Sequence, residues 1–172
     1  MRKMIEKCSI SKNISEISLA IAAEMNLDIE TLNKIKLAGL MHDIGKIGLS
    51  EEVLNGLHTP DTEEWKQIRK HPEIGYRILS SSDKFADIAV FVLNHHERWD
   101  GKGYPKGLKG ENIPLAARII AVAEAFDAMT GSETYKTVMW EEEAKEELRK
   151  GSGKQFDPEI IAILLDKILK QP

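Results

Sequence analysis

The chain has 172 residues, a length that predicts one domain with a core of its own. Hydrophobic residues make up 42% of it and charged residues 30%, which excludes a wholly disordered protein. The formal net charge of −4 argues against a broad surface for DNA or for anionic membranes, although it leaves room for a small basic pocket.

The cysteine content and the hydropathy pattern indicate in which cellular compartment the protein is expected. Cys8 is the only cysteine, so an intrachain disulfide is impossible. The N-terminal residues lack the apolar stretch of a signal peptide, and no apolar run reaches the length of a membrane span. We therefore expect a cytoplasmic protein without a membrane span.

Apolar residues recur at three- and four-residue spacing through the first half of the chain, which is the period of an amphipathic helix. Asp28 and Asp61 are suited to cap helices, and Pro72 is suited to the first turn of one. The helices predicted here cover, in order, residues 10–26, 29–43, 50–54, 61–70 and 72–79.

The second half of the chain is also helical apart from one glycine-rich segment, residues 98–112. Gly151 is expected to stop one helix, and Asp157 followed by Pro158 is expected to open the last. The predicted helices are 85–95, 114–130, 140–150 and 158–170. No repeat and no convincing strand pattern is present, so the prediction is a single all-α domain over residues 1–172 with seven to nine helices.

Histidines and one adjacent aspartate are the candidates for chemistry, because imidazole and carboxylate groups are the usual ligands of divalent transition metals. The five histidines are His42, His58, His71, His95 and His96. Helix ends can converge on a shared centre, and four of the five are predicted at helix ends. Taken singly, a His-Asp or His-His pair is more often a solvated surface feature than a ligand set, and we assign His58 no role.

The order of the motifs along the chain favours a ligand set over a solvated surface feature. The chain reads MHDIGKI at residues 41–47, KHPEIG at 70–75 and HHERWDGKGYP at 95–105. This series closely resembles the HD-GYP family of metal-dependent phosphohydrolases, a branch of the HD superfamily, over nearly the whole chain. The resemblance implies an HD-domain helical bundle that carries a glycine-rich loop.

The resemblance also implies an activity and a site. Family members hydrolyse cyclic di-GMP at a cluster of two or three metal ions, commonly iron or manganese. Asp43 matches the carboxylate that bridges two metals, and Lys46 matches a lysine that faces the substrate phosphate; we take these two as the catalytic pair. The positions that match metal ligands are His42, Asp43, His71, His95, His96 and, with a changed residue, Glu124. The predicted substrate contacts are Lys46, Arg118, Tyr135 and Lys136.

Three departures from the family pattern affect the expected strength of the site. Ile10 stands where the family has a histidine ligand, and Glu133 stands where an arginine meets the substrate phosphate. Glu124 replaces an aspartate but remains a competent oxygen ligand, and Asp127 one turn later is either a ligand or a supporting carboxylate. We expect one firm metal position at Asp43, His71, His95 and His96. The second position, at His42, Asp43 and Glu124, is expected to be weak or missing.

Two interpretations remain open at this point. The retained ligands and Lys46 favour a metal-dependent phosphodiesterase of cyclic di-GMP or a related nucleotide, weakened by the departures. The changes at Ile10 and Glu133 favour an inactive metal- or nucleotide-binding interaction module. In that second case the Gly-Tyr-Pro loop would contact a signalling partner, and the family resemblance points to diguanylate cyclase domains.

Overall fold

The computed structural model describes residues 2–55, 62–131 and 139–170, with the side chains of residues 2–10 and 55 excepted. Nine α-helices lie within these ranges, and no strand does, so the all-α prediction is confirmed. The helices are α1 Arg2–Glu24, α2 Ile29–Met41, α3 Glu51–Asn55, α4 Glu63–Ile68, α5 His71–Leu79, α6 Ala86–Asn94, α7 Leu115–Thr130, α8 Glu141–Gly151 and α9 Pro158–Ile163. Short 3₁₀ turns are η1 Ile44–Gly48, η2 Asp83–Phe85 and η3 Gly110–Asn112, and a π-turn, η4, covers Leu164–Ile168.

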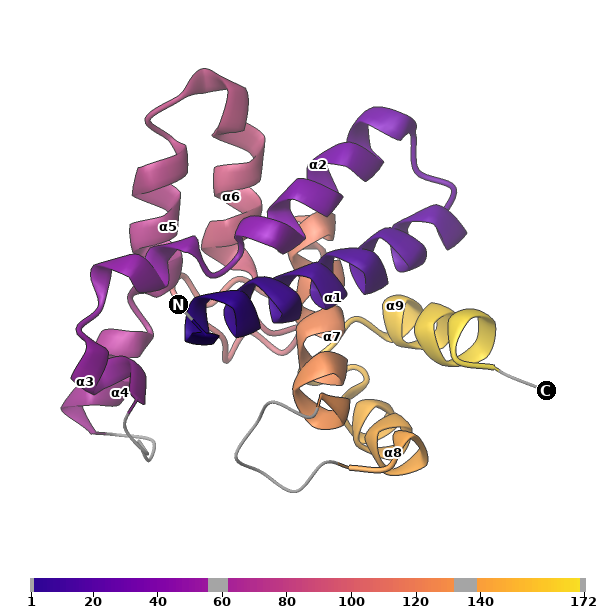
Figure 1. The fold of residues 1–172 in the computed structure, drawn as a ribbon. Helices are drawn as coiled ribbons and strands as arrows, with labels where there is room; N and C mark the ends of the chain where they lie inside the picture. The colour runs from indigo at the N-terminus through magenta and orange to yellow at the C-terminus, as the bar shows by residue number, and fades with distance from the viewer. Residues whose placement is uncertain (1, 56–61, 132–138, 171–172) are drawn as a thin grey trace.

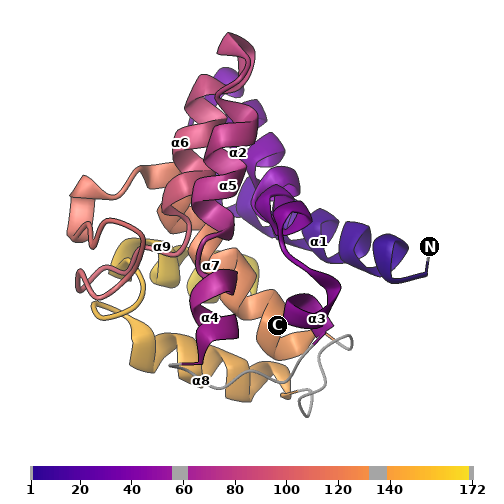
Figure 2. The same cartoon turned by 90° about the vertical axis from the view of Figure 1, so that its left-hand side faces the viewer.

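Helix α7 runs through the middle of the bundle and separates two groups of helices (Figure 1). Helices α1 and α2 pack side by side, and α5 pairs with α6 as a hairpin on the same side of the molecule (Figures 1 and 2). Helices α8 and α9 also pack against α7. Successive apolar residues of α7 enter different parts of the core: Ile119 and Val122 pack toward α8 and α9, and Ile120 and Ala123 pack toward α6.

Helix starts largely follow the predicted caps. The Asp28 side chain accepts a hydrogen bond from the backbone N–H of Thr31 at 3.0 Å, and the Asp157 side chain accepts one from Glu159 at 2.9 Å. Helix α4 is capped by Thr62 instead of Asp61, which lies outside the described residues. The cap moves by one residue because Thr62 Oγ1 reaches the N–H of Trp65, at 3.1 Å.

Two predicted helix ends differ from the structure by more than two residues. Helix α1 starts at Arg2, well before the predicted residue 10. The last helix is regular only to Ile163, and the chain then passes through the π-turn η4, whose end is marked by a hydrogen bond from the Leu169 N–H to the Leu164 carbonyl at 2.9 Å. Helical spacing of apolar residues locates both elements but does not fix their ends. In the last element the same apolar pattern fits an α-helix and a π-turn equally well.

Turn η1 packs closely against the first turn of α5, and the contact depends on glycine. A Cβ atom on Gly45 would collide with the carbonyl oxygen of His71 and would lie 2.6 Å from the backbone nitrogen of Gly75. Both atoms belong to the backbone and cannot swing aside. The absence of a side chain at Gly45 therefore brings the chain after α2 against the start of α5.

The glycine-rich loop between α6 and α7 is held by a buried carboxylate. Glu97 is 4% exposed, and its two oxygens accept hydrogen bonds from the backbone N–H groups of Lys106 at 2.7 Å and Leu108 at 3.0 Å. The N–H groups of Trp99 and Asp100 donate to carbonyls of the turn after α8, at 3.1 and 2.7 Å. The loop is therefore fixed at both of its sides.

None of the helices in the described ranges is long and apolar enough to cross a membrane.

The Gly45 contact predicts a sharp difference between two neighbouring glycines. Gly45→Ala should destabilise the protein by about 3 kcal/mol or more, because backbone atoms must separate to admit the methyl group. Gly48→Ala is the matched control, since its Cβ would meet only side-chain carbons of Ile74, at 3.2 and 3.3 Å, and should cost less than about 1 kcal/mol. Urea denaturation measures both, and equal losses would contradict the packing described.

The Glu97 contact predicts a second difference. Glu97→Gln should cost about 1–3 kcal/mol, because its amide group would face a backbone N–H that then has no acceptor. Glu111→Gln in the same loop, where the side chain is exposed, should be within about 0.5 kcal/mol of the wild type. Thermal unfolding of the two variants measures this difference in stability. A Glu97→Gln variant as stable as the wild type would show that the loop does not depend on this carboxylate.

Candidate metal centre

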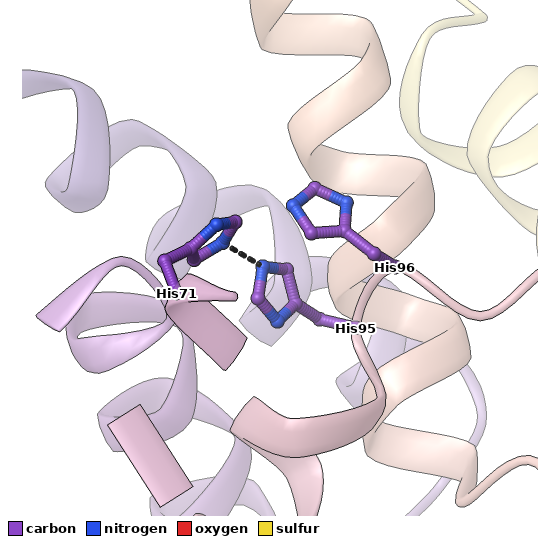
Figure 3. A group of neighbouring side chains, drawn as sticks. All are labelled: His71, His95 and His96. Atoms are coloured by element: carbon purple, nitrogen blue, oxygen red, sulfur yellow. Dashed lines mark hydrogen bonds between the residues drawn. The ribbon is translucent and has the colours of Figure 1, made fainter. Parts of the chain in front are cut away.

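Helix ends bring together the five residues that the motifs single out. His42 directly follows α2 and Asp43 comes next; His71 is the first residue of α5, and His95 and His96 directly follow α6. Three of the imidazole rings point toward one another in front of α7, as Figure 3 shows. The structure brings these five predicted positions together, and their assignment as metal ligands stays a prediction.

The ligand atoms lie at short distances from one another. His71 Nε2 is 3.3 Å from His95 Nε2, a contact drawn as a dashed line in Figure 3, and His96 completes a group whose ligand atoms lie within 4.8 Å of one another. Asp43 joins this group through Oδ1, 3.4 Å from His71 Nε2, and its other oxygen lies 3.5 Å from His42 Nε2.

Three of the rings are oriented by the same kind of hydrogen bond. The Nδ1 atom of each donates to the backbone carbonyl three residues earlier: His42 to Gly39 at 2.7 Å, His71 to Ile68 at 2.8 Å and His95 to Val92 at 2.6 Å. A carbonyl oxygen is only an acceptor, so this network assigns the proton to Nδ1 in all three rings. In the neutral ring, Nε2 then offers a lone pair to the centre of the cluster.

These donors fit a divalent cation. With both Nδ1 atoms protonated, the 3.3 Å contact between His71 and His95 places two lone pairs face to face, which is unfavourable unless a cation lies beside them. Oδ1 of Asp43 is buried without a hydrogen-bond partner among the described residues. Two nitrogen ligands on one ion, with bonds of about 2.1 Å, would stand roughly 3.0–3.4 Å apart, which is the separation found here.

The charge states suit metal binding. Burial lowers the pKa of His71 and His95, and burial with the neighbouring histidines lowers that of His96 to about 3, so these rings are neutral at pH 7. At His42 burial also acts to lower the pKa, but the charge of Asp43 outweighs it and raises the pKa to about 9. Burial alone would raise the pKa of Asp43, yet the positive charges of His42 and Lys46 hold this pKa well below its usual value. A metal would find an ionised carboxylate and three neutral rings, and would displace a proton from His42.

Two further predicted residues lie at the cluster. Lys46 Nζ is 2.6 Å from Oδ2 of Asp43, one 3₁₀ turn away. Glu124, on α7, has Oε2 at 3.8 Å from Nδ1 of His96. Both side chains are partly exposed, Lys46 at 31% and Glu124 at 24%, so they lie at the accessible side of the site.

Arg118, another predicted substrate contact, makes its interactions away from the histidine cluster. The Arg118 guanidinium pairs with the buried Asp157 at 2.5 Å and donates to the carbonyl of Ile113 at 3.0 Å. It also lies 5.7 Å from the Trp99 ring centroid, so it ties the loop to the C-terminal helices. Its predicted substrate role stays a prediction. Outside the described residues or side chains lie Ile10, Glu133, Tyr135 and Lys136.

Two residues beside the histidines had no role in the sequence-based prediction. Tyr104 stacks on His96, with ring centroids 4.9 Å apart and an interplanar angle of 25°, and the Arg69 guanidinium carbon lies 4.3 Å from the Tyr104 centroid. Tyr104 belongs to the Gly-Tyr-Pro motif, which marked the loop but not this contact. Arg69 carried no signal beyond its position two residues before His71.

Similarity to known sequences covers most of the chain. A family model described as HD domain matches residues 3–160. A cyclic di-GMP phosphodiesterase of Thermotoga maritima is 41% identical over 159 residues, which are 90% of this chain and 43% of the relative. The cyclic di-GMP phosphodiesterase response regulator RpfG of Xanthomonas campestris is 38% identical over 90% of this chain and 41% of its own length. The chain thus spans about two fifths of the length of these relatives.

Solved structures share the fold. A cyclic GMP-AMP specific phosphodiesterase of Vibrio cholerae, V-cGAP3, superposes with a TM-score of 0.74 at 21% identity over 94% of this chain and 44% of that one. Bd1817 of Bdellovibrio bacteriovorus, described as an HDG"Y"P protein, gives 0.73 at 24% identity over 95% and 53%. With its histidine cluster, its glycine-rich loop and these similarities, the chain belongs to the HD domain family and, within it, to the HD-GYP branch.

Proposed function

We propose that the chain is a metal-dependent phosphodiesterase that hydrolyses cyclic di-GMP. The observation that carries the proposal is the buried cluster in which Asp43 lies within 3.5 Å of both His42 and His71. The names of the relatives supply the substrate: those at 41% and 38% identity are cyclic di-GMP phosphodiesterases. A related protein of Vibrio cholerae at 37% identity is named a 3'3'-cGAMP-specific phosphodiesterase, so a hybrid cyclic dinucleotide is the second substrate to test.

The residues divide the chemistry between them. Divalent cations held by these residues would supply a nucleophilic water near neutral pH and would neutralise charge on the phosphoryl group. Asp43 directs one oxygen toward His71 and the other toward His42 and Lys46, which suits a carboxylate shared by two positions. Lys46, which is partly exposed, adds a point charge that a substrate phosphate can reach. His42, His71 and His95 are at most 1% exposed, so bulk water is kept away from their ligand atoms.

We further infer from the family resemblance that the metal is iron or manganese; the mixed set of imidazoles and carboxylates is compatible with both ions. One firm ion would be held by Asp43, His71, His95 and His96. A second, weaker one would be held by His42, Asp43 and Glu124. Binding of a diguanylate cyclase domain through the Gly-Tyr-Pro loop stays a prediction from the family resemblance.

Metal binding is the first prediction of this proposal. Protein reconstituted with Mn²⁺ and desalted should retain at least one ion per chain, and its melting temperature should rise by about 5–10 °C at a hundredfold excess over the dissociation constant. Asp43→Asn should retain less than a tenth as much metal and should melt at the same temperature with or without Mn²⁺. His58→Ala, which changes the histidine assigned no role, is the control. A wild-type protein without metal after reconstitution with Mn²⁺ and with Fe²⁺ would sink the proposal.

Turnover is the second prediction. The loaded protein should convert cyclic di-GMP to the linear dinucleotide, which chromatography separates from the substrate. Lys46→Met should lower kcat by about a hundredfold with metal content retained, since one electrostatic contact to the reacting phosphate is removed. Lys46→Arg keeps the charge and should retain more activity than Lys46→Met.

The interaction-module interpretation makes the opposite prediction in the same assay. A wild-type protein that binds Mn²⁺ and cyclic di-GMP but releases no linear product would favour that module over the enzyme. Loss of metal binding in Lys46→Met would instead show that Lys46 acts only by holding Asp43.

A further inference from the structure

His96 is oriented differently from the other histidines of the cluster. His42, His71 and His95 each donate Nδ1–H to a backbone carbonyl. Among the residues that the structure describes, the His96 ring makes no hydrogen bond, and its Nδ1 lies 3.8 Å from the nearest carboxylate oxygen, that of Glu124. Something other than a hydrogen bond must therefore set the plane of this ring.

The contacts of His96 are aromatic. Its ring stacks on Tyr104 at a centroid distance of 4.9 Å and an angle of 25°, and it meets His95 at 4.0 Å and His71 at 4.9 Å. The backbone N–H of Tyr104 also donates to the carbonyl of His96 at 3.2 Å. The loop thus returns onto His96 with both the backbone and the ring of one residue.

Tyr104 is itself held from two directions. The Arg69 guanidinium, at the end of α4, lies 4.3 Å from the Tyr104 ring centroid, within the range of a cation–π contact. Two residues further along the loop, the N–H of Lys106 is bound by the buried carboxylate of Glu97. The ring is therefore fixed relative to the α4–α5 junction that also carries His71.

We propose that Tyr104 is the positioning residue of His96, and that Arg69 holds Tyr104 in place. The lone pair of an imidazole nitrogen lies in the plane of the ring, so a stacked neighbour that fixes this plane also fixes the direction in which the nitrogen can bind a metal. Stacking on Tyr104 replaces the carbonyl hydrogen bond that orients the other three rings. This inference rests on the proposed function, since it assumes that His96 is a metal ligand.

The test measures the dissociation constant of Mn²⁺ by competition with a chelator. Tyr104→Leu keeps an apolar side chain but removes the ring, and should weaken Mn²⁺ binding about ten- to a hundredfold, as losses around ligating histidines do. Tyr104→Phe keeps the ring and should bind within about twofold of the wild type. Arg69→Ala should weaken binding about two- to fivefold, which corresponds to one exposed cation–π contact.

A double-mutant cycle separates positioning from general damage to the fold. In the background His96→Ala, the change Tyr104→Leu should have no further effect on Mn²⁺ affinity, because its route to the metal is already gone. An equal loss in both backgrounds would overturn the proposal, and so would a Tyr104→Leu variant that binds as tightly as the wild type. A wild-type protein that binds no Mn²⁺ fails the proposed function first, and the inference with it. A wild type that binds Mn²⁺ with unchanged affinity in Tyr104→Leu fails the inference alone.

Discussion

The carbonyl groups at the C-terminal ends of three helices orient three rings of the histidine cluster. The last carbonyls of a helix have no partner within it. At the ends of α2, α4 and α6 these free carbonyls belong to Gly39, Ile68 and Val92, and each accepts the Nδ1–H of a histidine. The C-terminal, negative ends of the α2 and α6 dipoles also lie there, which favours a bound cation. These three hydrogen bonds thus give the free helix carbonyls a donor and fix the proton of each ring on Nδ1, which leaves Nε2 facing the centre of the cluster.

The cost of this arrangement is repulsion among the groups that it gathers. Unprotonated nitrogens of His71 and His95 face each other at 3.3 Å, and no described residue offers a hydrogen bond to the buried Oδ1 of Asp43. Packing outside the cluster therefore has to hold these repelling groups together. The contact of Gly45 with the backbone of His71 does so from one side, and α7, whose residues enter both parts of the core, does so from the other. The close approach of η1 and α5 is therefore a condition of the site, since Asp43 immediately precedes that turn.

The glycine-rich loop completes the centre where no helix end is available. His96 lies one residue beyond His95, so a carbonyl three residues earlier does not serve its ring. A stack on Tyr104 takes that place, and Glu97 and Arg69 fix the loop on either side of it. The loop thereby helps to set the geometry of the histidine cluster. With His96 as the proposed metal ligand, anything that binds to the loop and moves Tyr104 would act on the metal through His96.

The sequence by itself determined the helical class, the caps at Asp28 and Asp157, and the set of residues that forms the cluster, because helix periods and caps are local and the motifs are contiguous. It did not determine which nitrogen of each histidine faces the centre, the pairing of Arg118 with Asp157, or the contact of Arg69 with Tyr104. Tertiary structure alone decided these. The partners are 35 to 39 residues apart along the chain, or depend on which carbonyl a helix end leaves free, and only packing brings such groups within bonding distance.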